Sequence, residues 1–275
     1  MVRRVTLIAG SGSLVPRIAD AAQRRGDILQ IIDIVGRSDL SGNAVVHIPL
    51  AKAAELIKAV KAFRTSHLVL AGAVHISDAE RAGLAKAFGL VGRIAKSLGD
   101  VGFVGMIVLY ARMNGVRLIG AQDVAPDLLA EDGPIAGPPL DATTRAFAGL
   151  ALKGAQAIGA IDLGQSIVFS GDRPVAAEDA GGTDALLGRV IELRTAGLIG
   201  NGSAPLILAK ALKPKQPRFA DLPSIGAETV RRAAAAGISV IVVEAGKSLV
   251  LERSELGDAA KAAGVSVVGL KVGNG

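Results

Sequence analysis

The sequence contains no cysteine and no tryptophan, and only 3% of its residues are aromatic. The absence of cysteine excludes disulfides, thiolate nucleophiles and cysteine-ligated zinc, and it agrees with a reducing cytoplasm. The scarcity of aromatic rings argues against a nucleic-acid surface, because such surfaces stack bases on aromatic side chains. Because 50% of the residues are hydrophobic, we expect a large core that is aliphatic.

Long apolar runs and dense basic runs are lacking as well. No uninterrupted apolar stretch approaches the ~20 residues that a membrane-spanning helix needs. The lysines and arginines exceed the acids by 31 − 25 = 6, but they are scattered in short pairs such as Arg3-Arg4 and Arg231-Arg232, which argues against nucleic acid. The apolar start of the chain is short and ends in a glycine turn, so we interpret it as a strand and not as a signal peptide.

The order of apolar runs predicts an α/β protein. Strands expected at Val5–Ala9, Ile28–Val35 and His67–Ala71 alternate with helices expected at Leu14–Arg25 and Ala53–Phe63. This alternation is typical of a Rossmann-like parallel sheet with helices on both faces. The other elements expected in this half are helices at 79–88, 91–98 and 103–110 and a strand at 117–120.

The second half is expected to form its own α/β domain. Four prolines and two glycines between Asp123 and Pro139 make the densest cluster of chain breakers. We therefore predict a Rossmann-like nucleotide- or phosphate-binding domain at 1–135 and a C-terminal α/β catalytic domain at 136–275. Elements expected there include a helix at 144–158, a hairpin around Gly171-Asp172, and strands at 206–211, 239–243 and 265–270.

A glycine turn follows the first expected strand. Gly10-Ser11-Gly12-Ser13 opens a helix whose free N–H groups favour an anion, and glycine lets a phosphate approach the backbone. The dinucleotide fingerprint G-x-G-x-x-G is incomplete, because Val15 stands at the third glycine position, although Asp33 is placed for a ribose. The turn is interpreted as a phosphate or nucleotide contact, with an ordinary strand-to-helix turn as the alternative.

Acids and amides follow other expected strands or begin helices. Gln122 and Asp123 stand at the carboxyl end of a strand, where ligands bind parallel sheets, but a polar helix cap is an equal alternative. The acidic, glycine-rich stretch before Asp184 suits either a divalent cation or capping groups. Glu244 is a candidate metal or ligand contact, or part of a plain strand-end loop. The Gly246-Lys247-Ser248 sequence lacks the upstream glycine of a P-loop.

The segment from Lys213 to Gly226 departs most from the apolar pattern. Lys213, Gln216 and Arg218 provide cations and an amide that can hold phosphate oxygens. Asp221 follows in a proline-punctuated turn and could bind Mg²⁺ or position a water. The alternative is a charged surface loop with Asp221 capping a turn.

Together these segments resemble the LpxI-type UDP-2,3-diacylglucosamine pyrophosphatases of lipid A synthesis. The resemblance rests on six segments that occur in the family's order and cover most of the chain: Ile8–Leu14, Gly120–Asp123, Gly182–Ala185, Lys213–Gln216, Asp221–Gly226 and Val243–Leu249. It implies a two-domain enzyme that encloses a lipid-linked UDP-sugar between its domains. It also implies Mg²⁺-dependent cleavage of the pyrophosphate to UMP and 2,3-diacylglucosamine 1-phosphate.

The resemblance also implies roles for individual residues. Asp221 is expected to be the catalytic carboxylate and, with Asp123, Asp184 and Glu244, a metal ligand. The expected substrate-binding residues are Gly10, Ser11, Gly12, Ser13, Gln122, Thr183, Lys213, Gln216, Arg218 and Ser248. Pro217 stands where the family's pattern leads us to expect an acid, so a second metal ligand is in doubt there. We expect a cytoplasmic protein with peripheral contact to the inner membrane, and leave homodimer formation open.

Two other function classes stay open at this level. One is an NAD(P)-dependent oxidoreductase with a degenerate fingerprint, although no Tyr-Lys or histidine proton-transfer set is evident. The other is a non-catalytic nucleotide- or lipid-binding protein. Release of UMP from the UDP-lipid distinguishes the hydrolase from both.

Overall fold

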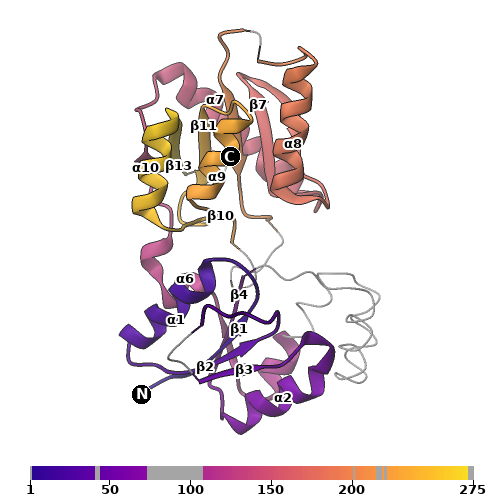
Figure 1. Ribbon diagram of the computed structural model, residues 1–275, viewed down its shortest axis with the longest axis vertical. Helices are drawn as coiled ribbons and strands as arrows, with labels where there is room; N and C mark the ends of the chain where they lie inside the picture. The colour runs from indigo at the N-terminus through magenta and orange to yellow at the C-terminus, as the bar shows by residue number, and fades with distance from the viewer. Residues whose placement is uncertain are drawn as a thin grey trace. The chain divides into compact units, whose positions relative to one another are not determined.

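A computed structural model describes residues 2–40, 44–72, 108–200, 202–214, 219 and 222–271. The helices expected at 79–88 and 91–98, and most of the one at 103–110, lie outside these residues, as do Gln216, Arg218 and Asp221. The chain divides between Asp127 and Leu128 into two compact units, each with its own sheet (Figure 1).

The N-terminal unit contains a parallel sheet covered by helices. Its strands are β1 (Arg4–Ala9), β2 (Ile28–Asp33), β3 (Ala44–His47), β4 (His67–Ala71) and β5 (Arg117–Ile119), in the order β3-β2-β1-β4-β5. Each neighbouring pair is parallel. Ile8 and Ile32 pack with α2 (Ala53–Ala62) and the helical residues 108–113, and the alternate residues Leu7 and Ile31 face α1 (Leu14–Arg24).

The C-terminal unit contains a six-stranded mixed sheet. In spatial order its strands are β6 (Gly133–Ala136), β13 (Ser266–Leu270), β11 (Val240–Glu244), β9 (Leu206–Lys210), β7 (Ser166–Ser170) and β8 (Arg173–Ala177). The three central strands β13, β11 and β9 are parallel, and the other three are antiparallel to their neighbours. A separate two-stranded sheet pairs β10 (Ser224–Ile225) with β12 (Leu249–Val250).

Helices cover both faces of this six-stranded sheet (Figure 1). Val240 and Val242 of β11 pack with α7 (Ala142–Ala160) on one face. Ile241 and Val243 point to the opposite face, which α8 (Gly182–Thr195), α9 (Ala227–Ala235) and α10 (Arg253–Ala263) cover. The strand is apolar from Val240 to Val243 because it is buried on both sides.

The predicted α/β fold class is confirmed, and the elements that the sequence reading left out are short or lie at edges. β3 is a four-residue edge strand with mostly exposed side chains. β6 contains Pro134, which an edge strand tolerates because it needs no ladder hydrogen bond there. α6 (Ala121–Val124), η1 (Leu50–Lys52) and η2 (Pro126–Leu128) are each a single turn. None of the described helices is both long and apolar enough to span a bilayer.

Candidate functional site

The glycine turn lies at the carboxyl edge of the N-terminal sheet. It joins β1 to α1, and the side chains of Ser11 and Ser13 are exposed at the start of that helix. Gly12 has φ +99°, which glycine adopts without strain, and Ser13 makes no side-chain capping bond. The helix has no acid in its first turn. The turn therefore has the form expected for an anion contact, and its role in substrate binding stays a prediction.

Close packing behind the turn explains a glycine that the sequence reading did not single out. Gly72 follows β4 with φ +89°, and a Cβ atom there would lie 2.5 Å from the carbonyl oxygen of Ser11. The N–H of Gly10 donates to Ala71 O over 2.8 Å. Arg37 is largely buried and donates from Nη1 to the carbonyl oxygen of Gly10 over 2.7 Å. The turn is thus held by the strand beside it and by a cation.

Asp33, the candidate ribose acid, is engaged by its own loop and by His47 of β3. Its Oδ1 accepts the N–H groups of Val35 and Gly36, and its Oδ2 accepts the N–H of Arg37 and faces Nδ1 of His47. Burial alone would raise the pKa of Asp33, but these hydrogen bonds outweigh it and hold the pKa below its ordinary value of 3.8. The carboxylate therefore stabilises the strand-end loop.

Gln122 and Asp123 belong to the single-turn helix α6. Asp123 Oδ2 accepts the N–H of Gly120 over 2.8 Å, which is the capping interaction considered as an alternative. Asp123 is exposed, whereas Gln122 is buried against Gly120. A metal-binding role for Asp123 and a substrate contact for Gln122 stay predictions.

Two polar clusters lie at the carboxyl edge of the C-terminal sheet, on opposite faces. Lys210 ends β9 beside Val243, whose side chain points to the α8 face. Glu244 ends β11 beside Leu270, whose side chain points to the α7 face. Because neighbouring residues in parallel strands share a face, the two charged side chains point in opposite directions.

The first cluster, called the Lys210 cluster, contains Ser166, Glu178, Thr183 and Lys210. Lys210 Nζ donates to Thr183 Oγ1 over 3.1 Å, and Thr183 Oγ1 donates to Glu178 Oε2 over 2.9 Å. Ser166 Oγ lies 3.2 Å from the same threonine oxygen. Lys210 and Glu178 are only 6% and 8% exposed. A lysine held this way places a positive charge at the sheet edge with little conformational freedom, which suits binding of a phosphate group.

The second cluster, called the Glu244 cluster, surrounds a carboxylate that is 3% exposed. Glu244 Oε1 accepts from Lys247 Nζ over 2.7 Å and from Gln156 Nε2 over 3.0 Å. Its Oε2 accepts the N–H of Leu212 over 3.3 Å. These contacts fasten α7 and the segment after β9 to the end of β11. Glu244 therefore holds Leu212, two residues after the end of β9.

The other predicted residues of this unit lie in three different settings. Asp184 is exposed and pairs with Arg232 Nη1 of α9 at 2.5 Å, and the carboxylates of Glu228 and Asp184 raise the pKa of Arg232. Lys213 Nζ lies 2.8 Å from Asp162. Ser248 is buried, and its Oγ has no hydrogen-bond partner among the described residues. Of these, Ser248 retains a free polar atom for a ligand.

The described carboxylates do not by themselves form a magnesium site. Within the described part of the chain, no three His, Asp or Glu side chains gather closely enough to hold a metal ion. Protein groups already contact three of the predicted ligands: Asp123 and Glu244 accept hydrogen bonds, and Asp184 forms an ion pair. Asp221, the remaining predicted ligand, lies outside the described residues. Metal binding by these four acids stays a prediction.

Sequence reasoning did not select Lys210, Ser166 or Gln156. A signal existed for Lys210, because it is a charged residue inside an otherwise apolar expected strand. No such signal marked Gln156, which sits within an alanine-rich helix and meets Glu244 only in the folded chain. Arg37 was missed for the same reason, since its partner Gly10 lies 27 residues away.

Comparison with solved structures finds NAD-binding proteins of low similarity. Thermus thermophilus UDP-glucose 4-epimerase in complex with NAD is 16% identical, with 98% of this chain and 88% of that chain covered at a TM-score of 0.32. WbmG of Bordetella bronchiseptica with NAD is 20% identical over 42% of this chain and 36% of its own, at a TM-score of 0.28. The chain thus spans about a third of WbmG, and such TM-scores support no inference about function.

Comparison of sequences gives a match over nearly the whole chain. The model of the LpxI N-terminal domain matches residues 4–128, and that of the LpxI C-terminal domain matches residues 131–268. The UDP-2,3-diacylglucosamine pyrophosphatase LpxI of Caulobacter vibrioides is 30% identical over 277 residues, which cover 98% of both chains. The resemblance seen in the motifs is confirmed, and the chain belongs to the LpxI family.

Proposed function

We propose that this protein is a hydrolase that cleaves the pyrophosphate of UDP-2,3-diacylglucosamine to UMP and 2,3-diacylglucosamine 1-phosphate, in lipid A synthesis. The observation that carries the proposal is the match of both family domains along the chain, together with the Caulobacter vibrioides pyrophosphatase that is 30% identical over 98% of it. Water adds across one P–O–P linkage, so that one P–O bond breaks and each product keeps one phosphate.

The geometry of the C-terminal unit supports a phosphate-handling site. The Lys210 cluster presents a fixed cation and a hydroxyl at the carboxyl edge of β9, and Lys213 follows three residues later. Fixed positive charge of this kind stabilises the charge that develops on phosphoryl oxygens. We propose that these groups, with Gln216 and Arg218, bind the diphosphate and that Asp221 takes the proton of the attacking water.

The alternative of a nicotinamide oxidoreductase is disfavoured by the N-terminal unit. A dinucleotide-binding fold uses the acid at the end of its second strand for the ribose hydroxyls. Here that acid, Asp33, accepts three backbone N–H groups and faces His47. A ribose would have to displace those contacts.

The decisive experiment compares wild-type protein with Asp221→Ala. The variant should release UMP from UDP-2,3-diacylglucosamine at least about a hundredfold more slowly, because a positioned base contributes that much or more, while substrate binding is retained. Asp172→Ala, an exposed acid in the hairpin turn, is the matched control. Near-normal turnover by Asp221→Ala would refute the role of this residue.

The same assay tests the metal and the rival functions. A chelator should abolish UMP release, and added Mg²⁺ should restore it. A ligand that binds the folded state raises the melting temperature by mass action. We expect no binding of NAD, so NAD should leave the melting temperature unchanged. Binding of the UDP-lipid by wild-type protein with Mg²⁺ and no UMP release would instead identify a non-catalytic binding protein.

A further inference from the structure

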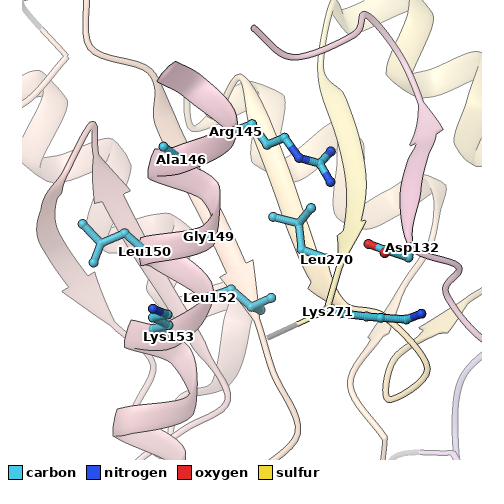
Figure 2. A pocket seen from close by; sticks show the side chains of 9 residues that line it. All are labelled: Asp132, Arg145, Ala146, Gly149, Leu150, Leu152, Lys153, Leu270 and Lys271. Atoms are coloured by element: carbon cyan, nitrogen blue, oxygen red, sulfur yellow. The ribbon is translucent and has the colours of Figure 1, made fainter. Parts of the chain in front are cut away.

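A groove in the C-terminal unit, with a volume of about 430 Å³, lies beside α7 and the end of β13 (Figure 2). Three cations line it, and the acid there is Asp132; the cations are Arg145, Lys153 and Lys271. In Figure 2 Arg145 extends from α7 towards the side of the groove where Asp132 and Lys271 lie. None of the groove's residues belongs to either polar cluster, and the groove adjoins the Glu244 cluster through Leu270, the strand neighbour of Glu244.

The groove carries a net positive charge. None of its three cations forms an ion pair with a described carboxylate. By contrast, Lys213 and Lys247 elsewhere in this unit are each paired with an acid. Cations that pair with no described carboxylate favour an anionic partner. Two flexible ammonium groups beside a guanidinium suit phosphate.

The same groove is apolar on its floor and outer lip. Leu152 and Leu270 are buried beneath it, whereas Leu150 is 43% exposed at its edge. Leu150 continues an exposed face of α7 that runs at helical spacing through Ala146, Leu150, Lys153, Ala157 and Ile161. Ile161 is 74% exposed, and α7 contains no acidic residue from Ala142 to Ala160.

We propose that this surface, called the α7 face and made of Arg145, Leu150, Lys153, Ile161 and Lys271, docks on a bilayer of anionic phospholipid. A lipid phosphate enters the groove between the cations, while Leu150 and Ile161 contact the acyl region at the interface. A free nucleotide is a poorer occupant, because no aromatic side chain lines the groove to stack a base. Exposed apolar side chains flanked by unpaired cations match an interface that is itself apolar and anionic.

The proposal that the α7 face docks on a membrane does not depend on the proposed hydrolysis. The residues of this face belong to neither the Lys210 cluster nor the Glu244 cluster, so the two proposals fail separately. Docking through this face would hold the protein at a surface where an insoluble, acylated substrate resides. Release of UMP from detergent-solubilised substrate should therefore be unchanged by substitutions in the α7 face.

The test is co-sedimentation with vesicles of phosphatidylcholine, with and without phosphatidylglycerol. Wild-type protein should bind the anionic vesicles and not the neutral ones. The double variant Arg145→Gln, Lys271→Gln should bind about thirtyfold more weakly, since each basic residue near an anionic surface contributes roughly fivefold. The matched control is Arg189→Gln, Lys261→Gln, which removes two exposed cations from the opposite, α8 and α10 face.

Leu150→Asp adds an independent variant that keeps the cations. It should also weaken binding to anionic vesicles, and its melting temperature reports whether the exposed substitution leaves the fold intact. Three outcomes overturn the proposal: no binding by wild-type protein, equal loss in the control double variant, or unchanged binding by both groove variants. A change in molecular mass with Leu150→Asp, without a change in vesicle binding, would assign the face to a second copy of the chain and also overturn it.

Discussion

Asp33 and Glu244 occupy equivalent places in the two units and are used in different ways. Each is the last residue of a parallel strand, and they are 2% and 3% exposed. Asp33 is held by backbone N–H groups two to four residues later and by His47 of the adjacent strand. Glu244 is held by Lys247 and by Gln156, which is 88 residues away.

The difference lies in where along the chain the partners of each carboxylate come from. In the N-terminal unit the strand-end acid is satisfied mainly by its own loop, so it contributes to stability and leaves no acceptor for a ligand. In the C-terminal unit, side chains from distant parts of the sequence converge at the sheet edge, with Lys210 on one face and Glu244 on the other. Such convergence fixes charged groups rigidly, as phosphoryl chemistry requires.

Among the residues that the structure describes, the largest expected effect is at Lys210. Lys210→Met should lower kcat/KM for UMP release about a hundredfold, because a fixed donor at developing negative charge contributes that much. Arg37→Met removes the cation beside the glycine turn and should lower kcat/KM for UMP release less than Lys210→Met does. Measurement of kcat/KM alongside the melting temperature checks this comparison.

A control keeps the Lys210 result interpretable. Loss of a buried charged partner also destabilises the fold, by about 3–5 kcal/mol when the other partner stays charged. Lys210→Arg keeps the charge and should recover part of the activity. If Arg37→Met reduces kcat/KM more than Lys210→Met in proteins that remain folded, the assignment of phosphate handling to the C-terminal unit is wrong.

An intermediate effect is expected at Asp33, on stability and its pH dependence. Asp33→Asn should lower the free energy of unfolding at pH 7 by about 1–3 kcal/mol, because buried N–H groups lose a charged acceptor. The folded-state pKa lies below 3.8, so the carboxylate's contribution is present above that value and is lost as the pH falls through the folded-state pKa.

Urea unfolding at several pH values measures the contribution of Asp33 to the free energy of unfolding. The difference between wild type and Asp33→Asn should shrink as the pH is lowered from 7 to below 3.8. Asp20→Asn, an exposed acid on α1, serves as the control and should change little. A difference that grows on acidification would contradict the structural role of Asp33.

The smallest effect is expected at Asp184. Its side chain is 71% exposed and pairs with Arg232 at the surface, and exposed pairs contribute little to stability. Asp184→Asn should leave the melting temperature and UMP release nearly unchanged. Titration of Mg²⁺ tests the predicted metal-binding role of Asp184, since a higher Mg²⁺ requirement in this variant would support it.

Local pattern predicted the buried parts of both units well. Apolar runs located β1, β4, β9 and β11 to within a residue or so, because strands buried on both faces need uninterrupted apolar sequence. Two of the four described edge strands of the two larger sheets escaped detection, since β3 is exposed and β6 contains Pro134. The other two, β5 and β8, were expected from the sequence. Of the predicted site residues, Thr183 joins a buried cluster, whereas Asp184, next to it in sequence, points to solvent.

The fold class, the family and the glycine turn could be predicted from the amino-acid sequence, because each depends on residues that are adjacent or recur at a fixed period. Which charges meet is a property of the folded chain. Lys210 and Thr183, Glu244 and Gln156, and the cations of the α7 face come together through strand register and helix packing. Those contacts depend on the direction of a side chain at a sheet edge, and neither composition nor spacing encodes that direction between distant segments.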